Sequence, residues 1–70
     1  MTGILVVQVV QGSVAYAEGL RKGDIIREVN RVEVPTMRKF RDILEAIHPG
    51  ETILLRILRE SKAFFVVLKP

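Results

Sequence analysis

The residues of this chain best suited to catalysis are one histidine and two serines. His48 stands directly before a proline, and Ser13 and Ser61 both lie in segments predicted to be turns. A serine nucleophile needs a histidine that faces it and that is itself held by a carboxylate. Hydroxyl groups in turns commonly cap backbone groups instead. We therefore predict that the chain has no catalytic residues and is a non-catalytic domain.

The sequence also lacks the usual ligand sets for a metal ion or a phosphate group. It contains no cysteine, and a single histidine without neighbouring ligands does not fill a tetrahedral site. Gly12, Gly19 and Gly23 do not follow a strand at the spacing of a phosphate-binding loop. We therefore expect no metal and no cofactor.

The net charge of +3 raises the question of nucleic-acid binding. Nucleic-acid-binding surfaces cluster their basic residues, and single-strand binders add aromatic side chains that stack on bases. Here the basic residues are spread along the chain, at Arg21, Lys22, Arg27, Arg31, Arg38, Lys39, Arg41, Arg56, Arg59, Lys62 and Lys69. We expect no nucleic-acid partner, and a small basic nucleic-acid-binding domain is kept as the alternative of another class.

With catalysis, metal binding and nucleic-acid binding disfavoured, we expect the chain to recognise a partner through a sheet edge and a helix face. This depends on the strands and helices that the sequence predicts. The period of the apolar residues predicts strands over residues 4–10, 24–30, 52–58 and 63–69, with a short strand over 32–34. The first strand is apolar except for Gln8, which is typical of a strand covered on both faces. The strand over 24–30 alternates imperfectly, so we expect a bulge there. Ser13 is the predicted N-cap of a short helix over 14–18.

A longer helix is predicted over residues 37–47, with Thr36 as its N-cap. Its apolar residues recur every three or four positions and form a broad stripe: Met37, Phe40, Ile43, Leu44 and Ile47. The sequence His48-Pro49-Gly50 ends the helix, because the residue before a proline is pushed out of the helical region. Strands and helices in this order predict an α+β domain with a small, mostly antiparallel sheet.

Five segments of the chain resemble the signature of PDZ domains. They are Gly3-Ile4-Leu5-Val6, Val9-Val10-Gln11-Gly12-Ser13-Val14-Ala15, Glu18-Gly19-Leu20, Lys22-Gly23-Asp24-Ile25-Ile26 and Val29-Asn30. The capped helix, Pro49-Gly50 and the final hairpin extend the resemblance over nearly the whole chain, in a form similar to the PDZ domains of bacterial HtrA/Deg proteases. Val14 and Arg31 depart from the usual proline and glycine. The resemblance implies one PDZ-like domain over residues 1–70, a partial barrel with one long and one short helix, from a larger protein.

PDZ domains bind extended carboxyl-terminal peptides beside the long helix. The resemblance implies that Met37, Arg41 and Leu44 form the helix wall of the peptide groove, while Phe40 faces the core. For Leu44, simple core packing stays open as the other interpretation, because the apolar stripe is wide. The resemblance aligns Gly3 with the strand after the groove strand. We therefore expect the carboxylate loop to lie upstream of Met1, and the domain to be truncated at its N-terminus.

The resemblance implies a peptide-binding module of an extracytoplasmic HtrA-type serine protease. Its expected partners are carboxyl-terminal peptides or unfolded proteins, and the protease domain of the same chain. Its expected location is the periplasm or the extracytoplasmic side of a membrane. The PDZ module of a site-2 metalloprotease or of a carboxyl-terminal processing protease is the alternative within the same fold. The incomplete groove leaves an open strand edge and an apolar helix face, so we also expect self-association there.

Overall fold

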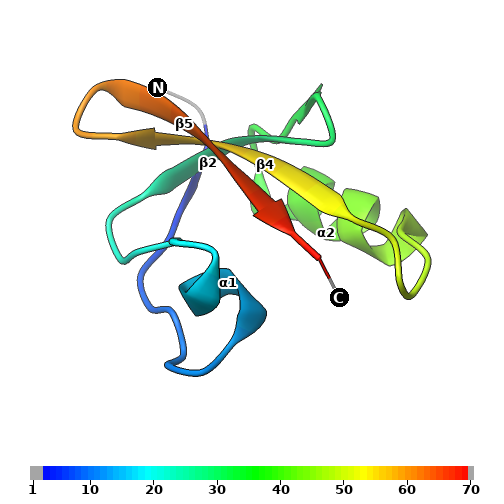
Figure 1. Cartoon of the computed structure of the whole chain (residues 1–70). Coiled ribbons are helices and arrows are strands. Elements are labelled where there is room, and N and C mark those ends of the chain that lie inside the picture. The colour runs from blue at the N-terminus through cyan, green and yellow to red at the C-terminus, as the bar shows by residue number, and fades with distance from the viewer. Residues whose placement is uncertain (1–2, 70) are drawn as a thin grey trace.

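The computed structural model describes residues 3–69 and has the predicted order of strands and helices (Figure 1). The elements are β1 (Ile4–Leu5), α1 (Val14–Ala17), β2 (Ile25–Val29), β3 (Val32–Glu33), α2 (Met37–Ala46), β4 (Ile53–Arg59) and β5 (Lys62–Leu68). No helix within this part of the chain is long and apolar enough to cross a membrane.

The strands form one open antiparallel sheet in the order β1-β2-β4-β5, with β3 paired to β2. The register between β2 and β4 shifts between Ile26 and Glu28. This irregularity is the bulge that the imperfect alternation predicts. Because the sheet does not close, β1 and β5 lie at its two edges.

Both helices contact the same hydrophobic core. Its buried side chains are Val6, Leu20, Ile26, Val29, Val34, Leu55, Ile57 and Val66. From the helices, Ala15 of α1 and Phe40 and Ile43 of α2 pack against this cluster and stay partly exposed. No side chain of α1 or α2 is fully buried, so the sheet supplies most of the core.

The predicted caps hold both helices at their first turns. The Ser13 hydroxyl accepts a hydrogen bond from the Tyr16 N–H at 3.1 Å, and the Thr36 hydroxyl accepts one from the Lys39 N–H at 3.2 Å. Each bond satisfies one of the N–H groups that have no partner within the helix. Helix α2 ends at Ala46, one residue before the predicted end, because Ile47 is already extended with ψ of 127°.

The prediction of a strand over residues 4–10 is wrong beyond its first two residues. Regular pairing stops after Leu5, and Val6 adds the last contact with the β2 side. The Val6 N–H donates to the Asp24 carbonyl, and the Val6 carbonyl accepts from the Gly23 N–H, each at 2.8 Å. The expected cover on both faces is also absent, since Leu5 and Val7 are exposed. The sequence preference is that of a strand, but among residues 3–69 no neighbouring strand pairs with residues 7–10.

Gly3 is fixed by close packing where the chain enters β1. A Cβ atom at this position would lie 2.6 Å from Cγ2 of Ile25 and 2.9 Å from the carbonyl oxygen of Ile26. Neither distance is compatible with a side chain at residue 3. The glycine of the Gly3-Ile4 motif therefore lets β1 approach β2.

Two tight turns place ordinary residues in the left-handed region. Asn30 and Arg31 have φ of 51° and 70°, and Glu60 and Ser61 have φ of 49° and 67°. Positive φ at both central residues is the pattern of a type I′ hairpin turn, which favours Asn-Gly. Asn30 suits its position, whereas Arg31, Glu60 and Ser61 occupy this region at a steric cost.

Candidate functional site

Helix α2 has two apolar faces, and only one of them packs on the core. Phe40, Ile43 and Ile47 pack against the buried cluster. Met37, Arg41 and Leu44 follow at intervals of four and three residues and therefore share another face, about a quarter turn away. Met37 is 50% exposed and Leu44 is 36% exposed.

An apolar cavity lies at the carboxyl end of this helix. Its volume is about 480 Å³. Apolar side chains from both helical regions and from the ends of β4 and β5 line it, namely Val14, Leu44, Ile47, Ile53 and Leu68. The cavity is shallow and largely open to solvent, so an aliphatic or aromatic side chain that lay in it would be partly covered.

The structure brings only one of the three predicted site residues to this cavity. Leu44 lines it, whereas Met37 and Arg41 continue the same helix face away from it toward the amino end of α2. Sequence reasoning missed Val14, Ile53 and Leu68. They belong to three separate elements, and no local pattern indicates that they meet.

The rim of the cavity is polar. His48, Glu51 and Lys69 lie around it. The Glu51 carboxylate accepts a hydrogen bond from the His48 backbone N–H at 2.8 Å, and its Oε1 lies 3.0 Å from His48 Nδ1. The histidine is thus tied into the turn that follows α2. The Ser13 hydroxyl is engaged as well, since it caps α1.

A stretch of open backbone borders the core on another side. Within residues 3–69, no backbone–backbone hydrogen bond involves Val7, Gln8 or Val9. Val9 packs against the same core cluster as Phe40 of α2. An extended segment beside residues 7–9 could form hydrogen bonds with their free N–H and carbonyl groups, and such groups are what strand addition requires.

A polar network around Asp24 and Arg59 holds loops together. Arg59 donates to both carboxylate oxygens of Asp24, at 2.8 and 2.7 Å, and to the Gly19 carbonyl at 2.8 Å. The Arg21 N–H donates to the same carboxylate at 2.8 Å. The hydrogen bond from Arg59 lowers the pKa of Asp24, which is only 1% exposed. This bidentate pair joins the end of β4 to the loop before β2.

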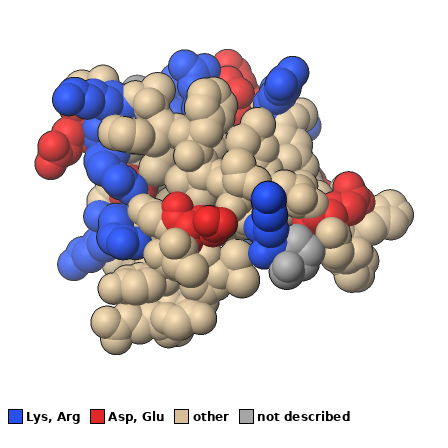
Figure 2. Space-filling model, in the orientation of Figure 1, with Lys and Arg blue, Asp and Glu red and all other residues tan. Residues whose placement is uncertain are grey.

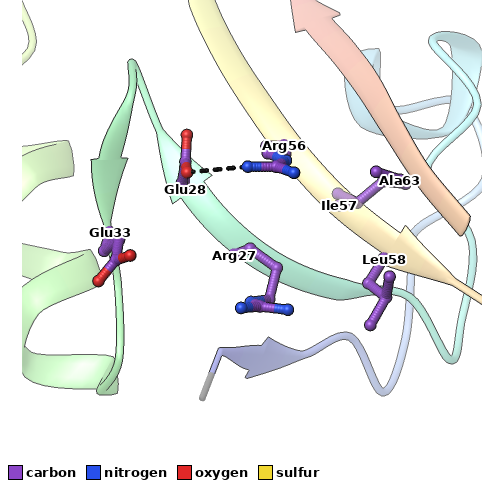
Figure 3. Close-up of a pocket in the computed structure, with 7 residues that line it drawn as sticks. All are labelled: Arg27, Glu28, Glu33, Arg56, Ile57, Leu58 and Ala63. Atoms are coloured by element: carbon purple, nitrogen blue, oxygen red, sulfur yellow. Dashed lines mark hydrogen bonds and ion pairs between the residues drawn. The ribbon is translucent and has the colours of Figure 1, made fainter. Parts of the chain in front are cut away.

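A second, smaller hollow is lined by residues of β2, β3, β4 and β5 (Figure 3). Its volume is about 100 Å³, and Arg27 and Leu58 are among the residues that line it. Arg56 donates to the Glu28 carboxylate across it at 3.2 Å, so these charges satisfy each other. The hollow is too small and too polar for an apolar side chain. Within the described residues, no cluster of histidine, aspartate and glutamate could hold a metal ion.

Comparison with known proteins identifies the family to which this fold belongs. The sequence profile described as "PDZ domain" matches residues 5–59. The chain is 33% identical to the "Probable periplasmic serine endoprotease DegP-like" of Hahella chejuensis over 67 residues, which are 96% of this chain and 14% of that protein. It is 33% identical to "Serine protease HTRA4" of Mus musculus over 69 residues, 99% of this chain and 14% of that protein.

A third relative, the DegP-like protein of Chlamydia trachomatis, is 40% identical over 60 residues, which are 86% of this chain and 12% of that protein. The chain thus spans a small part of the length of these relatives.

Solved structures agree with the sequence matches. An HtrA-type protease with a decapeptide superimposes with a TM-score of 0.86 and 25% identity, covering 96% of this chain and 20% of that one. The PDZ domain of an SdrC-like protein from Listeria monocytogenes superimposes with a TM-score of 0.83 and 23% identity, covering 99% of this chain and 72% of that one. The chain therefore belongs to the PDZ domain family, and its relatives in sequence are HtrA and DegP-like serine proteases.

Proposed function

We propose that this chain is the non-catalytic recognition module of an extracytoplasmic HtrA-type serine protease. It would bind carboxyl-terminal or unfolded segments of other proteins and position them for a separate protease domain of the same polypeptide. Family membership supports this proposal, together with relatives that are named periplasmic serine endoproteases. The structure named with a decapeptide is an HtrA-type protease of the same fold.

The observation that carries the proposal is the second apolar face of α2. A helix that packs only on its own domain buries its apolar stripe, whereas α2 leaves Met37 and Leu44 exposed, and Leu44 also lines the cavity of about 480 Å³. We infer that an apolar side chain of the ligand enters this cavity against Leu44. The next side chains on the same side of an extended ligand would pass Arg41 and then Met37.

Arg41 would add a charge preference to this groove. It lies in the first half of α2 with Arg38 and Lys39, where the positive end of the helix dipole disfavours cations. Within residues 3–69 it forms no ion pair. A carboxylate of the ligand is the group that would stabilise it. We therefore expect a preference for acidic residues among those that precede the apolar one.

The backbone of the ligand needs partners as well. Residues 7–9 have free backbone N–H and carbonyl groups with which a further strand could pair. That strand would come either from the ligand or from a segment that precedes the PDZ signature in the parent protein, and it would complete the groove. In the second case the segment would also supply the N–H groups that hold the carboxylate.

Peptide titration tests the proposal. Fluorescent peptides with an apolar last residue, with a free or an amidated carboxyl end, are titrated into the 70-residue chain and into the chain extended upstream in its native protein. We expect tighter binding by the extended protein, and a loss of about tenfold or more for Leu44→Asp, because the cavity would then hold a charge. Val32→Asp, at another exposed apolar position, is the matched control. Binding that tolerates Leu44→Asp as well as Val32→Asp would refute the proposed groove.

A further inference from the structure

Strand β5 lies at the opposite edge of the sheet from the proposed groove. It pairs with β4 without interruption from Ile53↔Leu68 to Arg59↔Lys62. It crosses the front of the molecule in Figure 1, and within the described residues no other strand pairs with it. Every second residue of β5 thus directs its backbone N–H and carbonyl groups to an open edge.

Two phenylalanines flank this edge on opposite faces of the sheet. Phe64 points to the core side and is 41% exposed, whereas Phe65 points to the other side and is 65% exposed. The Arg59 guanidinium lies 5.3 Å from the centroid of the Phe64 ring and covers it in part. Adjacent strand residues point to opposite faces, so a partner that packs on one face would cover only one ring. A strand added along the edge would contact both.

The edge lacks the features that usually prevent such pairing. Proteins block open edges with proline, bulges, charged side chains in mid-strand or very short strands. Residues 62–68 contain no proline, the register with β4 is unbroken, and the only charge is Lys62 at the first position. By contrast, β1 at the other edge is two residues long. Figure 2 shows largely uncharged surface where β5 crosses this view.

We propose that two copies of the chain pair β5 with β5, antiparallel and centred on Phe65. In this register Phe65 faces Phe65 of the second copy, and Ala63 faces Val67. Phe64 faces Val66, and Lys62 faces Leu68, so no two like charges lie opposite each other. The pattern of the strand is therefore complementary to itself, which a two-fold symmetric interface requires. The two sheets join into one, and the four exposed rings gain apolar neighbours.

Sedimentation velocity over a concentration series tests this dimer. We expect Phe65→Lys to raise the dimer dissociation constant by at least about 100-fold, since each dimer loses two phenylalanine side chains from its centre. Val32→Lys, exposed on β3, should leave it unchanged, and circular dichroism checks that both variants fold. A monomer up to about 1 mM would overturn the proposal. A dimer that survives Phe65→Lys but is lost in Leu44→Lys would overturn it too, since it would form through the α2 face.

Cysteine scanning tests the register separately. The chain has no cysteine, so each introduced thiol is unique. A mixture of the Ala63→Cys and Val67→Cys chains places two thiols opposite each other, within the Cα separation of about 4.4–6.8 Å that a disulfide allows, and should form a covalent dimer on mild oxidation without removing the central phenylalanine. Each variant alone is the matched control, because its equivalent lies four residues away along the strand pair. Equal cross-linking of the mixture and of the single variants, or none in the mixture, would exclude this register.

Discussion

Strand β4 and helix α2 both carry a strong apolar pattern, but the fold uses them differently. Strand β4 pairs with β2 on one side and with β5 on the other, and its Leu55 and Ile57 are buried. Helix α2 contacts the core through half-buried side chains and buries none completely. The central strands therefore supply the buried part of the fold, whereas α2 keeps an exposed apolar face, where we propose that a ligand binds.

The physical reason lies in how each element is attached. A central strand is fixed on both sides by backbone hydrogen bonds, and its side chains are then enclosed by neighbours. A helix satisfies its backbone internally and can be attached only through side-chain packing and its caps. Stability should thus depend on β4 and its surroundings, and ligand binding on α2. Four predictions test this difference, and they are described in order of decreasing effect.

Ile57→Ala should have the largest effect. Ile57 is 1% exposed in the middle of β4, and removing its side chain leaves a cavity that the paired strands cannot close. We expect a loss of about 4 kcal/mol in the free energy of unfolding, measured by urea denaturation. Leu58→Ala, on the other face of the same strand, is the matched control and should cost clearly less. Equal losses would mean that the two faces of β4 contribute alike.

Asp24→Ala should come second. The variant removes the carboxylate that binds Arg59 twice and leaves the Arg21 N–H without its partner. We expect a loss of about 2–3 kcal/mol at pH 7.

The pH dependence gives the control for this variant. Because the folded protein lowers the pKa of Asp24, the charged carboxylate stabilises the fold fully above its unfolded pKa of about 3.9. This contribution is lost as the pH falls through the lower folded pKa. The stability difference between the two proteins should therefore shrink in acid. A difference independent of pH would show that the ion pair is not its source.

Phe40→Ala and Leu44→Ala compare the two faces of α2 directly. Phe40 packs on the core but is partly exposed, so we expect a loss of about 2–3 kcal/mol, at or below the lower end for a buried phenylalanine. We expect Leu44→Ala to lower the free energy of unfolding less than Phe40→Ala does, and to weaken peptide binding more. Chemical denaturation and peptide titration of both variants measure the two effects. If Leu44→Ala destabilised as much as Phe40→Ala and bound peptide normally, Leu44 would be a core residue.

Arg31→Gly should have the smallest effect and the opposite sign. Arg31 has φ of 70° in the turn between β2 and β3, where glycine avoids the steric cost. We expect a gain of about 1 kcal/mol in the free energy of unfolding, partly offset by the greater freedom of glycine in the unfolded chain. Lys62→Gly, in a regular strand, should destabilise instead. A loss of stability in Arg31→Gly would indicate that the arginine side chain contributes a contact of its own.

The sequence alone determined the local features of this domain. The Ser13 and Thr36 caps, the helix over most of residues 37–47 and the final hairpin were all predictable, because capping and periodicity act between residues close in the chain. The motifs that begin at Gly3-Ile4 also predicted membership of the PDZ domain family. The assignment of Phe40 to the core and of Leu44 to another face came from the resemblance, because the apolar stripe of α2 is too wide to separate the two by itself.

Only the tertiary structure decided features that join distant residues. Asp24 and Arg59 are 35 residues apart, and neither has a local signal for the other. The cavity beside Leu44 is lined by Ile53 and Leu68, which three-dimensional packing alone brings together. Residues 6–10 show the limit most clearly. They have the composition of a buried strand, but a strand forms only where a neighbour supplies hydrogen bonds, and the sheet supplies them no further than Val6.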